Sequence, residues 1–321
     1  KLLLENISKG AFHDAAERGD PPKCHPRTRT AIRSELMEWI KAPEAKRKLV
    51  IWMYGPAGSG KTAIAQSIAE ECKALGLLAA SFFFFRTASE RNNATRFIAT
   101  IAYQISRFLP EFEDHVLNAI EWEPTIFSRK LSTQIKKLII EPLRLLPSAS
   151  VKPIFVVVDG LDECGPDSQS PSEVLEVLGT AISNLQHFPL LFLIGSRPDY
   201  EIRQIFSSDM LGAFTHSIVL DDTYKPDEDI RIYLISKFQE IQDRQRSAGS
   251  PLSASWPAEA DIDHLVYKAS GQFIFAATVV KFVDSSRYNP AQRLDIILGL
   301  STSGDENPFA LLDELYRYIL T

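Results

Sequence analysis

The residues of this sequence with the clearest chemical meaning lie in the run GPAGSGKT at residues 55–62. The run matches the pattern G-x-x-x-x-G-K-[ST], in which backbone amides wrap a phosphate chain and the lysine adds a positive charge beside the outer phosphates. The threonine hydroxyl is suited to a Mg²⁺ ion that bridges phosphate oxygens. We therefore predict a nucleotide site made by Gly55, Pro56, Ala57, Gly58, Ser59, Gly60, Lys61, Thr62 and Ala63.

The segments on either side of this run have the character that a phosphate-binding loop requires. Residues 49–54 are apolar, as expected for a buried strand, and residues 63–70 have the composition of a helix. A helix that begins at the loop directs its positive end at the phosphates. The strand, loop and helix thus predict a complete phosphate-binding unit.

A second group of candidate residues follows the apolar segment 154–158. Asp159 comes directly after it, so the carboxylate is expected at the end of a strand, where it can hold Mg²⁺ together with Thr62. Glu163 is our first candidate for the base that takes a proton from the attacking water, and Asp162 is the second. An apolar strand that ends in aspartate is common, but the preceding phosphate loop favours the metal-binding interpretation.

Arg197 completes the predicted catalytic set of Lys61, Glu163, Asp162 and Arg197. It follows the apolar segment 190–195, and an arginine at that place can sense the γ-phosphate, which hydrolysis removes. The alternative is an exposed arginine at a strand end.

Four further arginines have two interpretations each. Arg86 and Arg91 lie in a polar loop after the apolar segment 77–85, and they either contact phosphate or belong to a solvated loop. Arg27 and Arg29 precede a predicted helix and either touch the nucleotide or are solvated surface residues.

Alternating strand and helix patterns predict an α/β fold with a parallel sheet flanked by helices. The expected strands are 49–54, 77–85, 154–159, 190–195 and 217–220. A helix is expected before the first strand at 31–40, and further helices are expected between and after the strands at 94–108, 111–120, 128–146, 172–185 and 226–246. Residues 245–256 are polar and predict a flexible connection, after which a small all-helical domain is expected.

Composition narrows the function classes. The chain has 321 residues, of which 45% are hydrophobic and 24% charged, and its net charge of −6 argues against a dedicated nucleic-acid-binding protein. Three widely spaced cysteines indicate neither a disulfide framework nor a zinc site, so a cytoplasmic protein is expected. No apolar run is long enough to cross a membrane. The start at Lys1, without a signal peptide, suggests a piece of a longer protein.

Together these motifs resemble a NACHT-type module of the STAND class of P-loop NTPases, in its fungal and nephrocystin-like branch. The resemblance rests on the segments GPAGSGKT, FFFFR at 82–86, VVVDGLDEC at 156–164, IGSRPD at 194–199 and LDELYRYIL at 312–320. It implies an AAA-like sheet and four regions: N-terminal lead-in helices at 1–45, a P-loop NTPase (NACHT) domain at 46–224, a helical domain at 225–300 and the start of a winged-helix domain at 301–321.

The resemblance also implies a function. Relatives are slow switches that bind Mg²⁺ with ATP or ADP, or with GTP or GDP, and that form homo-oligomers in the triphosphate state. They act in signal transduction, including innate immunity and fungal nonself recognition, with effector and repeat domains that would lie outside this chain. Members often carry a G-x-P motif, and here Phe273 stands at the place of its proline, either stacked on the base or in the helical core.

Two other functions stay open from the sequence. One is an AAA-like ATPase that remodels protein or nucleic acid, and the other is a non-catalytic scaffold with bound ADP. The preference for adenine or guanine, the hydrolysis rate and the size of the oligomer are not determined by these residues.

Overall fold

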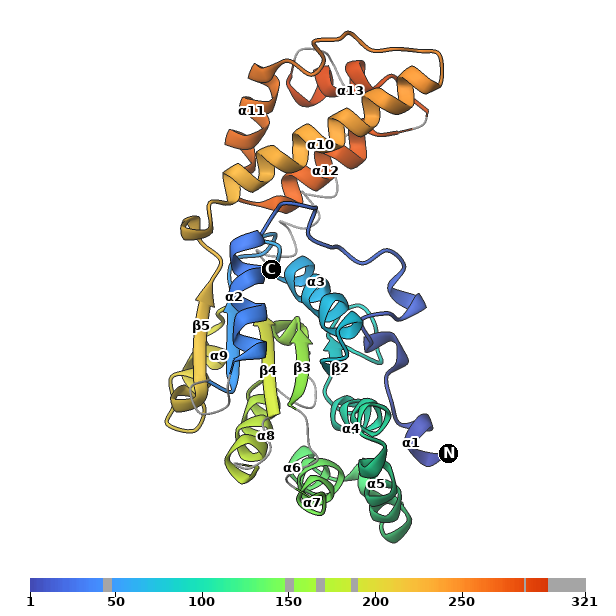
Figure 1. The fold of residues 1–321 in the computed structure, drawn as a ribbon, viewed down its shortest axis with the longest axis vertical. Helices are drawn as coiled ribbons and strands as arrows, with labels where there is room; N and C mark the ends of the chain where they lie inside the picture. The colour runs from blue at the N-terminus through green and yellow to red at the C-terminus, as the bar shows by residue number, and fades with distance from the viewer. Residues whose placement is uncertain (43–47, 148–152, 166–170, 186–189, 286, 300–321) are drawn as a thin grey trace. The chain divides into compact units, whose positions relative to one another are not determined.

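The computed structural model describes residues 1–42, 48–147, 153–165, 171–185, 190–285 and 287–299 (Figure 1). They form two compact units. The first unit comprises residues 1–23, 33–55 and 61–219, and the second comprises residues 24–32, 56–60 and the described residues from Leu220 onward. The winged-helix start predicted at 301–321 lies outside the described residues.

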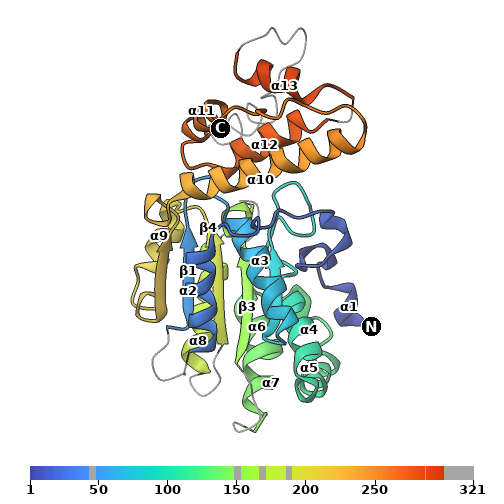
Figure 2. The same cartoon turned by 45° about the horizontal axis from the view of Figure 1, so that its top comes forward.

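The first unit is built on five parallel strands in the order β2-β3-β4-β1-β5. Figure 2 shows strands β1, β4 and β3 side by side, with α2 and α3 over one face of the sheet. The strands are β1 (Val50–Tyr54), β2 (Leu78–Phe83), β3 (Ile154–Asp159), β4 (Leu190–Ser196) and β5 (Thr215–Val219). The sheet confirms the predicted α/β fold class, and it places β4 between β1 and β3.

The register brings the ends of the strands to one edge. Tyr54 of β1 pairs with Ser196 of β4, and Phe83 of β2 pairs with Asp159 of β3. All strands are parallel, so the segments that follow β1, β2, β3 and β4 leave the sheet on the same side. The candidate site is assembled there.

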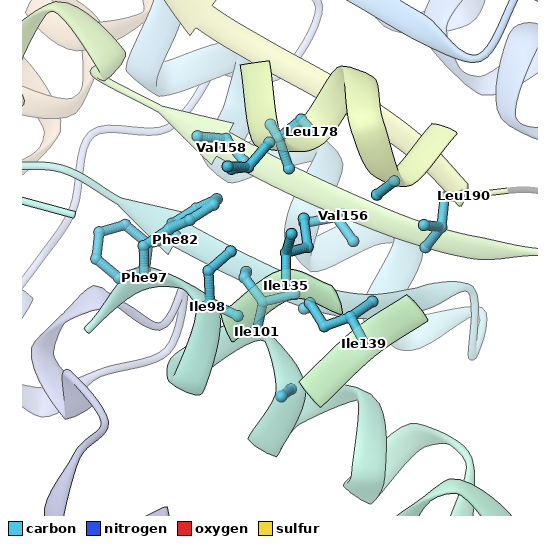
Figure 3. Packing of buried hydrophobic residues seen from close by; sticks show 14 of the residues in the cluster. Phe82, Phe97, Ile98, Ile101, Ile135, Ile139, Val156, Val158, Leu178 and Leu190 are labelled. Atoms are coloured by element: carbon cyan, nitrogen blue, oxygen red, sulfur yellow. The ribbon is translucent and has the colours of Figure 1, made fainter. Parts of the chain in front are cut away.

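Alternate strand residues point to opposite faces of the sheet, and β1, β2, β3 and β4 are largely apolar and buried because both faces are covered. One face packs against α4 (Phe97–Phe108), α8 (Pro171–Asn184) and their neighbours. Figure 3 shows Phe82 and Val156 of the sheet meeting Phe97, Ile101 and Leu178 of these helices. This cluster forms the main core of the unit.

The opposite face is covered by α2 (Thr30–Lys41) and α3 (Lys61–Ala74). Trp39 of α2 meets Phe155 of β3 edge to face, with ring centroids 6.0 Å apart. Met37 of α2 contacts Cys72 of α3. Ile64, Ile68 and Cys72 of α3 are buried, and this helix, which follows the phosphate loop, contacts β2, β3 and β4.

The first 23 residues are also part of this unit. They contain α1 (Leu2–Glu5) and the short 3-10 helices η1 (Lys9–Ala11) and η2 (Ala16–Arg18), and Leu3, Ile7 and Ala11 are buried. The backbone amides of Ser8 and His13 donate to the hydroxyls of Thr100 and Ser81, each at 2.9 Å. The segment thus adds to the core and to the hydrogen bonding of β2 and α4.

Two predictions about local structure were wrong. Residues 128–146 form α6 (Leu131–Ile135), a π-helical turn (Lys136–Ile140) and α7 (Glu141–Arg144) instead of one regular helix. Pro142 has no N–H to donate to the carbonyl of Leu138, which favours a disturbed hydrogen-bond ladder at this place. β2 ends at Phe83, and Phe85 is 46% exposed, whereas we expected it to be buried.

The remaining helices of the first unit are α5 (Pro110–Trp122), α9 (Tyr200–Phe206) and the 3-10 turns η4 (Ile126–Ser128), η7 (Leu161–Glu163) and η8 (Gly212–Phe214).

The second unit is helical in the part that the structure describes. After η9 (Asp222–Tyr224) it contains α10 (Pro226–Ser247), α11 (Glu259–Ala269), α12 (Phe273–Val283) and α13 (Pro290–Ile297). Figure 2 shows α10 beside α12. Ile230, Leu234 and Phe238 of α10 pack with Val279 and Val283 of α12 in an apolar core.

Candidate nucleotide-binding site

The predicted phosphate loop has the backbone conformation that such a loop needs. Gly58 and Gly60 have φ of 78° and 93°, values that residues with a Cβ rarely adopt. α3 begins at Lys61, so its first amides and positive end lie at the loop. The Lys61 ammonium donates to the carbonyl of Gly55 at 2.7 Å, and burial lowers its pKa.

Asp159 is the most deeply buried carboxylate of the site. It ends β3, is 2% exposed and accepts a hydrogen bond from the Thr62 hydroxyl. Burial raises its pKa to about 6, and its Oδ1 has no hydrogen-bond partner among the residues described. A buried carboxylate oxygen without a partner is costly, so a ligand at this oxygen would remove a real penalty.

The neighbouring strand leaves room for this carboxylate only because residue 195 is glycine. A Cβ at Gly195 would lie 2.5 Å from Asp159 Oδ1, a distance that real side chains do not reach. The sequence marked Gly195 merely as the end of a strand. The contact becomes visible only when β3 and β4 are known to be neighbours.

The residues present fit Mg²⁺ bound together with phosphate. Mg²⁺ in nucleotide sites uses one or two carboxylates, with phosphates and waters supplying the remaining oxygens. Asp159 and Thr62 offer an unpartnered carboxylate oxygen and a hydroxyl side by side. The described residues contain no cluster of three or more His, Cys, Asp or Glu that could hold a metal ion.

The two other predicted acidic residues have different partners. Asp162 accepts the backbone N–H of Arg197 through Oδ1 at 2.9 Å, and its Oδ2 lies 3.1 Å from Arg197 Nε. Glu163 Oε2 accepts the backbone N–H of Arg86 at 3.0 Å. Burial raises the pKa of Glu163, partly opposed by the bond from Arg86. Arg197 and Arg86 follow β4 and β2, so the segments after both neighbouring strands contact the segment after β3.

Arg18 is a charged neighbour of the site that sequence reasoning missed. Its guanidinium lies 3.7 Å from the centre of the Phe83 ring and donates to Gln66 of α3 at 2.5 Å. Burial lowers its pKa to about 10, and the negative charge of Asp159 opposes this shift. No local sequence signal links Arg18 to the site, because its position depends on how the N-terminal segment packs.

The four arginines for which the sequence left two interpretations differ in their exposure and their contacts. Arg27 is exposed, as expected of a surface residue. Arg91 is 7% exposed, lies 3.5 Å from Glu17 and stacks over Phe85, so the prediction of a solvated loop residue was wrong for it. Arg86 is exposed at its side chain.

Arg29 is also buried, at 5% exposure, and the solvated interpretation was wrong for it too. In the second unit it donates to the carbonyl of Ser59 at 2.9 Å, and its guanidinium lies 4.8 Å from the centre of the Phe273 ring. Its backbone N–H donates to Asp229 of α10 at 2.9 Å. Phe273 is partly buried against the helical core.

Within the described residues, no helix is both long and apolar enough to cross a membrane. A search of curated proteins found no match. Among solved structures the chain is similar to the Walker-type ATPase PABY2304 of Pyrococcus abyssi, with a TM-score of 0.54 and 13% identity over 92% of this chain and 78% of that one. At this identity the similarity shows the fold, which is that of a P-loop NTPase.

The family comparison adds a relationship at the level of sequence. The model of the family described as "Nephrocystin 3, N-terminal" matches residues 30–197, which cover more than half of the chain and include Lys61, Thr62, Asp159, Asp162, Glu163 and Arg197. The chain therefore belongs to the nephrocystin 3 N-terminal family.

Proposed function

We propose that this chain is a nucleotide-dependent signalling switch that binds Mg-ATP or Mg-GTP and hydrolyses it slowly. The observation that carries the proposal is the buried, unpartnered oxygen of Asp159 beside Thr62, at the start of the helix that follows a phosphate loop. Mg²⁺ at this pair would neutralise the charge that develops on the phosphates. The P-loop NTPase fold, shared with a Walker-type ATPase, supports the same chemistry.

The residues of the first unit have complementary roles in hydrolysis. Lys61 provides positive charge beside the outer phosphates. Glu163 accepts a proton from water, the water oxygen forms a bond to the γ-phosphorus, and the bond from that phosphorus to the bridging oxygen breaks, which leaves a nucleoside diphosphate and phosphate. The raised pKa of Glu163 favours this role, because a stronger base takes the proton more readily.

Arg197 is the residue that we propose to distinguish triphosphate from diphosphate. Its bonds to a γ-phosphate would exist only before hydrolysis. The module would then couple nucleotide state to homo-oligomerisation, and the effector and repeat domains would lie outside this chain. Such a switch hydrolyses nucleotide without a protein or nucleic-acid substrate, whereas a remodelling ATPase needs one for turnover. The assembly state of the switch should change when Glu163 is lost, whereas that of a scaffold should not.

Binding and single-turnover hydrolysis of ATP and GTP test the proposal. Lys61→Ala should weaken triphosphate binding by at least about 100-fold, since charge-assisted contacts to phosphate are lost. Lys73→Ala is the matched control, because it removes the same charge from an exposed position on the same helix. Glu163→Gln should retain binding but slow hydrolysis by about 10²- to 10⁴-fold, the usual contribution of a general base.

Light scattering on the same proteins tests the switch. Glu163→Gln should remain in the larger, triphosphate-bound assembly after the wild type has returned to the smaller one. Equal triphosphate binding by wild type and Lys61→Ala would contradict the proposed site. An assembly state that ignores Glu163→Gln would support the scaffold instead.

A further inference from the structure

Asp162 is placed to hold an arginine. Its side chain is 6% exposed, Oδ1 accepts the backbone N–H of Arg197, and Oδ2 faces Arg197 Nε. A general base needs a lone pair directed at the reacting water. Each oxygen of Asp162 already has a partner on Arg197, whereas Glu163 is bound through Oε2 to a backbone amide. The two acidic residues are therefore not equivalent candidates for the base.

The elements that carry this contact are well defined. Asp162 belongs to η7, which follows Gly160 at φ of 70° and is closed by a bond from the Glu163 amide to the Gly160 carbonyl at 2.7 Å. Arg197 follows β4, which pairs directly with β3. Two adjacent strand ends thus hold the carboxylate and the arginine together, and the contact does not depend on a long loop.

The form of the contact determines what it does to Arg197. The ion pair is closest at Nε, and the same carboxylate also binds the arginine's own backbone amide. Fixing both the backbone and the start of the guanidinium limits the directions that the group can take. The terminal amino groups of the planar fork are the donors suited to phosphate oxygens.

The geometry points to Asp162 as a positioning residue that orients the Arg197 guanidinium toward the terminal phosphate of a bound nucleoside triphosphate, with Glu163 alone as the base. This inference rests on the proposed function, since it assumes a triphosphate at the phosphate loop. It departs from the sequence prediction, in which Asp162 was a second candidate for the base. Asp162 acts through Arg197 and does not itself touch water or phosphate.

The test is a double-mutant cycle on nucleotide preference. Dissociation constants are measured for a β,γ-imido triphosphate and for the diphosphate in wild type, Arg197→Ala, Asp162→Ala and the double variant. We expect each single variant to lower the triphosphate-to-diphosphate preference by about tenfold, the usual size of a lost charge-assisted contact. The double variant should lose no more than either single one, because both remove the same oriented group.

Two further variants distinguish loss of Arg197 positioning from a general effect on charge or structure. Asp199→Asn removes a negative charge from the same segment at an exposed position, and it should keep the wild-type preference. Asp162→Asn keeps an acceptor for the backbone amide but loses the charge, so its preference should lie between wild type and Asp162→Ala. This milder variant also carries the test if Asp162→Ala does not fold.

A different pattern overturns the inference. If Asp162→Ala abolishes hydrolysis but leaves the triphosphate preference unchanged, Asp162 is a base. Losses of preference that multiply in the double variant would show that Asp162 and Arg197 act independently. Either result rejects the positioning role while nucleotide binding, and with it the proposed function, stands.

A measurement without nucleotide keeps the two proposals distinguishable. In protein labelled with ¹⁵N-arginine, the Nε–H signal that Arg197→Lys removes should exchange slowly in wild type and in Asp199→Asn, and quickly in Asp162→Asn. An unchanged exchange rate in Asp162→Asn overturns the inference even if the wild type binds nucleotide. If the wild-type protein binds no nucleotide but its Arg197 Nε–H exchanges slowly, the proposed function is rejected. The positioning role is then rejected as well, because there is no phosphate to sense.

Discussion

Among the arginines that contact acidic residues, Arg197 in the first unit and Arg29 in the second are held in different ways. Arg197 in the first unit faces both oxygens of Asp162, at 2.9 and 3.1 Å, and its side chain keeps 23% of its surface exposed. Arg29 in the second unit is 4% exposed at its side chain, and its Nε lies 4.0 Å from Asp229. Its Nε and Nη1 have no hydrogen-bond partner in the described part of the chain.

This difference indicates that Arg197 is suited to binding a ligand and that Arg29 stabilises the fold. A guanidinium that is oriented by a carboxylate and partly open can meet a phosphate with little rearrangement. A guanidinium packed on Phe273 and bonded to a loop carbonyl ties its own unit together. We therefore expect loss of Arg197 to affect nucleotide preference, and loss of Arg29 to affect stability.

The largest expected effect tests that contrast directly. Arg29→Ala leaves Asp229 without its cation and should destabilise the second unit by about 3 to 5 kcal/mol, the usual cost of breaking a buried ion pair. Hydrogen exchange at the amides of α10 and α12 measures it. Arg197→Ala should change that exchange little, and an equal effect of both substitutions would remove the distinction between the two arginines.

Asp159 is a buried carboxylate of the first unit, and its Oδ1 has no hydrogen-bond partner among the described residues. Its pKa of about 6 lies above the ordinary value of 3.8, so ionisation destabilises the folded protein, and stability should increase as the pH falls from about 7 toward 4. Asp159→Asn should stabilise the nucleotide-free protein at pH 7.5 by about 2 to 3 kcal/mol while abolishing stabilisation by Mg²⁺ and triphosphate.

Thermal unfolding with and without Mg²⁺ and nucleotide checks this prediction. A destabilised Asp159→Asn protein at pH 7.5 would contradict the cost that we assign to the buried charge.

Gly195→Ala tests how closely the site is built around Asp159. The added methyl must displace the carboxylate, so Mg²⁺ affinity in the presence of nucleotide should fall by about 10- to 100-fold, as when groups that orient a metal ligand are changed. Titration of Mg²⁺ against hydrolysis measures it. Ile194→Val is the control, a mild change in the buried residue before it, and it should leave Mg²⁺ affinity unchanged.

The smallest expected effect concerns His13, which ties the N-terminal segment to β2. Burial lowers its pKa below 6.5, so protonation opposes folding. Neutral His13 therefore contributes its full share of folding stability above pH 6.5, and this share is lost as the pH falls through the lowered pKa. His13→Gln should reduce this loss of stability between pH 7 and 5, measured as the difference from wild type so that the opposite pH dependence of Asp159 cancels.

The residues whose positions were easiest to predict are those that a local sequence pattern marks. Lys61, Thr62 and Asp159 could be placed together because a phosphate loop and a strand-end carboxylate meet at one edge of any parallel sheet. The apolar strands were equally clear, since buried parallel strands lack polar alternation. Phe85 escaped this rule because β2 ends two residues earlier.

The rest depends on contacts that are distant in the chain. The pairing of Asp162 with Arg197 requires β3 and β4 to be neighbours, which strand patterns alone do not determine. Arg29 bonds to Asp229, 200 residues further along the chain, so its polar surroundings in sequence were misleading. Arg18 reaches the site through the packing of a segment with no regular pattern of its own.

The most direct test of the central claim is the nucleotide content of the protein itself. The protein is purified without added nucleotide and denatured, and the released nucleotide is identified by chromatography. We predict stoichiometric ADP or GDP from the wild type, with the base deciding between the two preferences, and none from Lys61→Ala. An empty wild-type protein that also fails to bind ATP or GTP with Mg²⁺ would contradict the nucleotide-switch account.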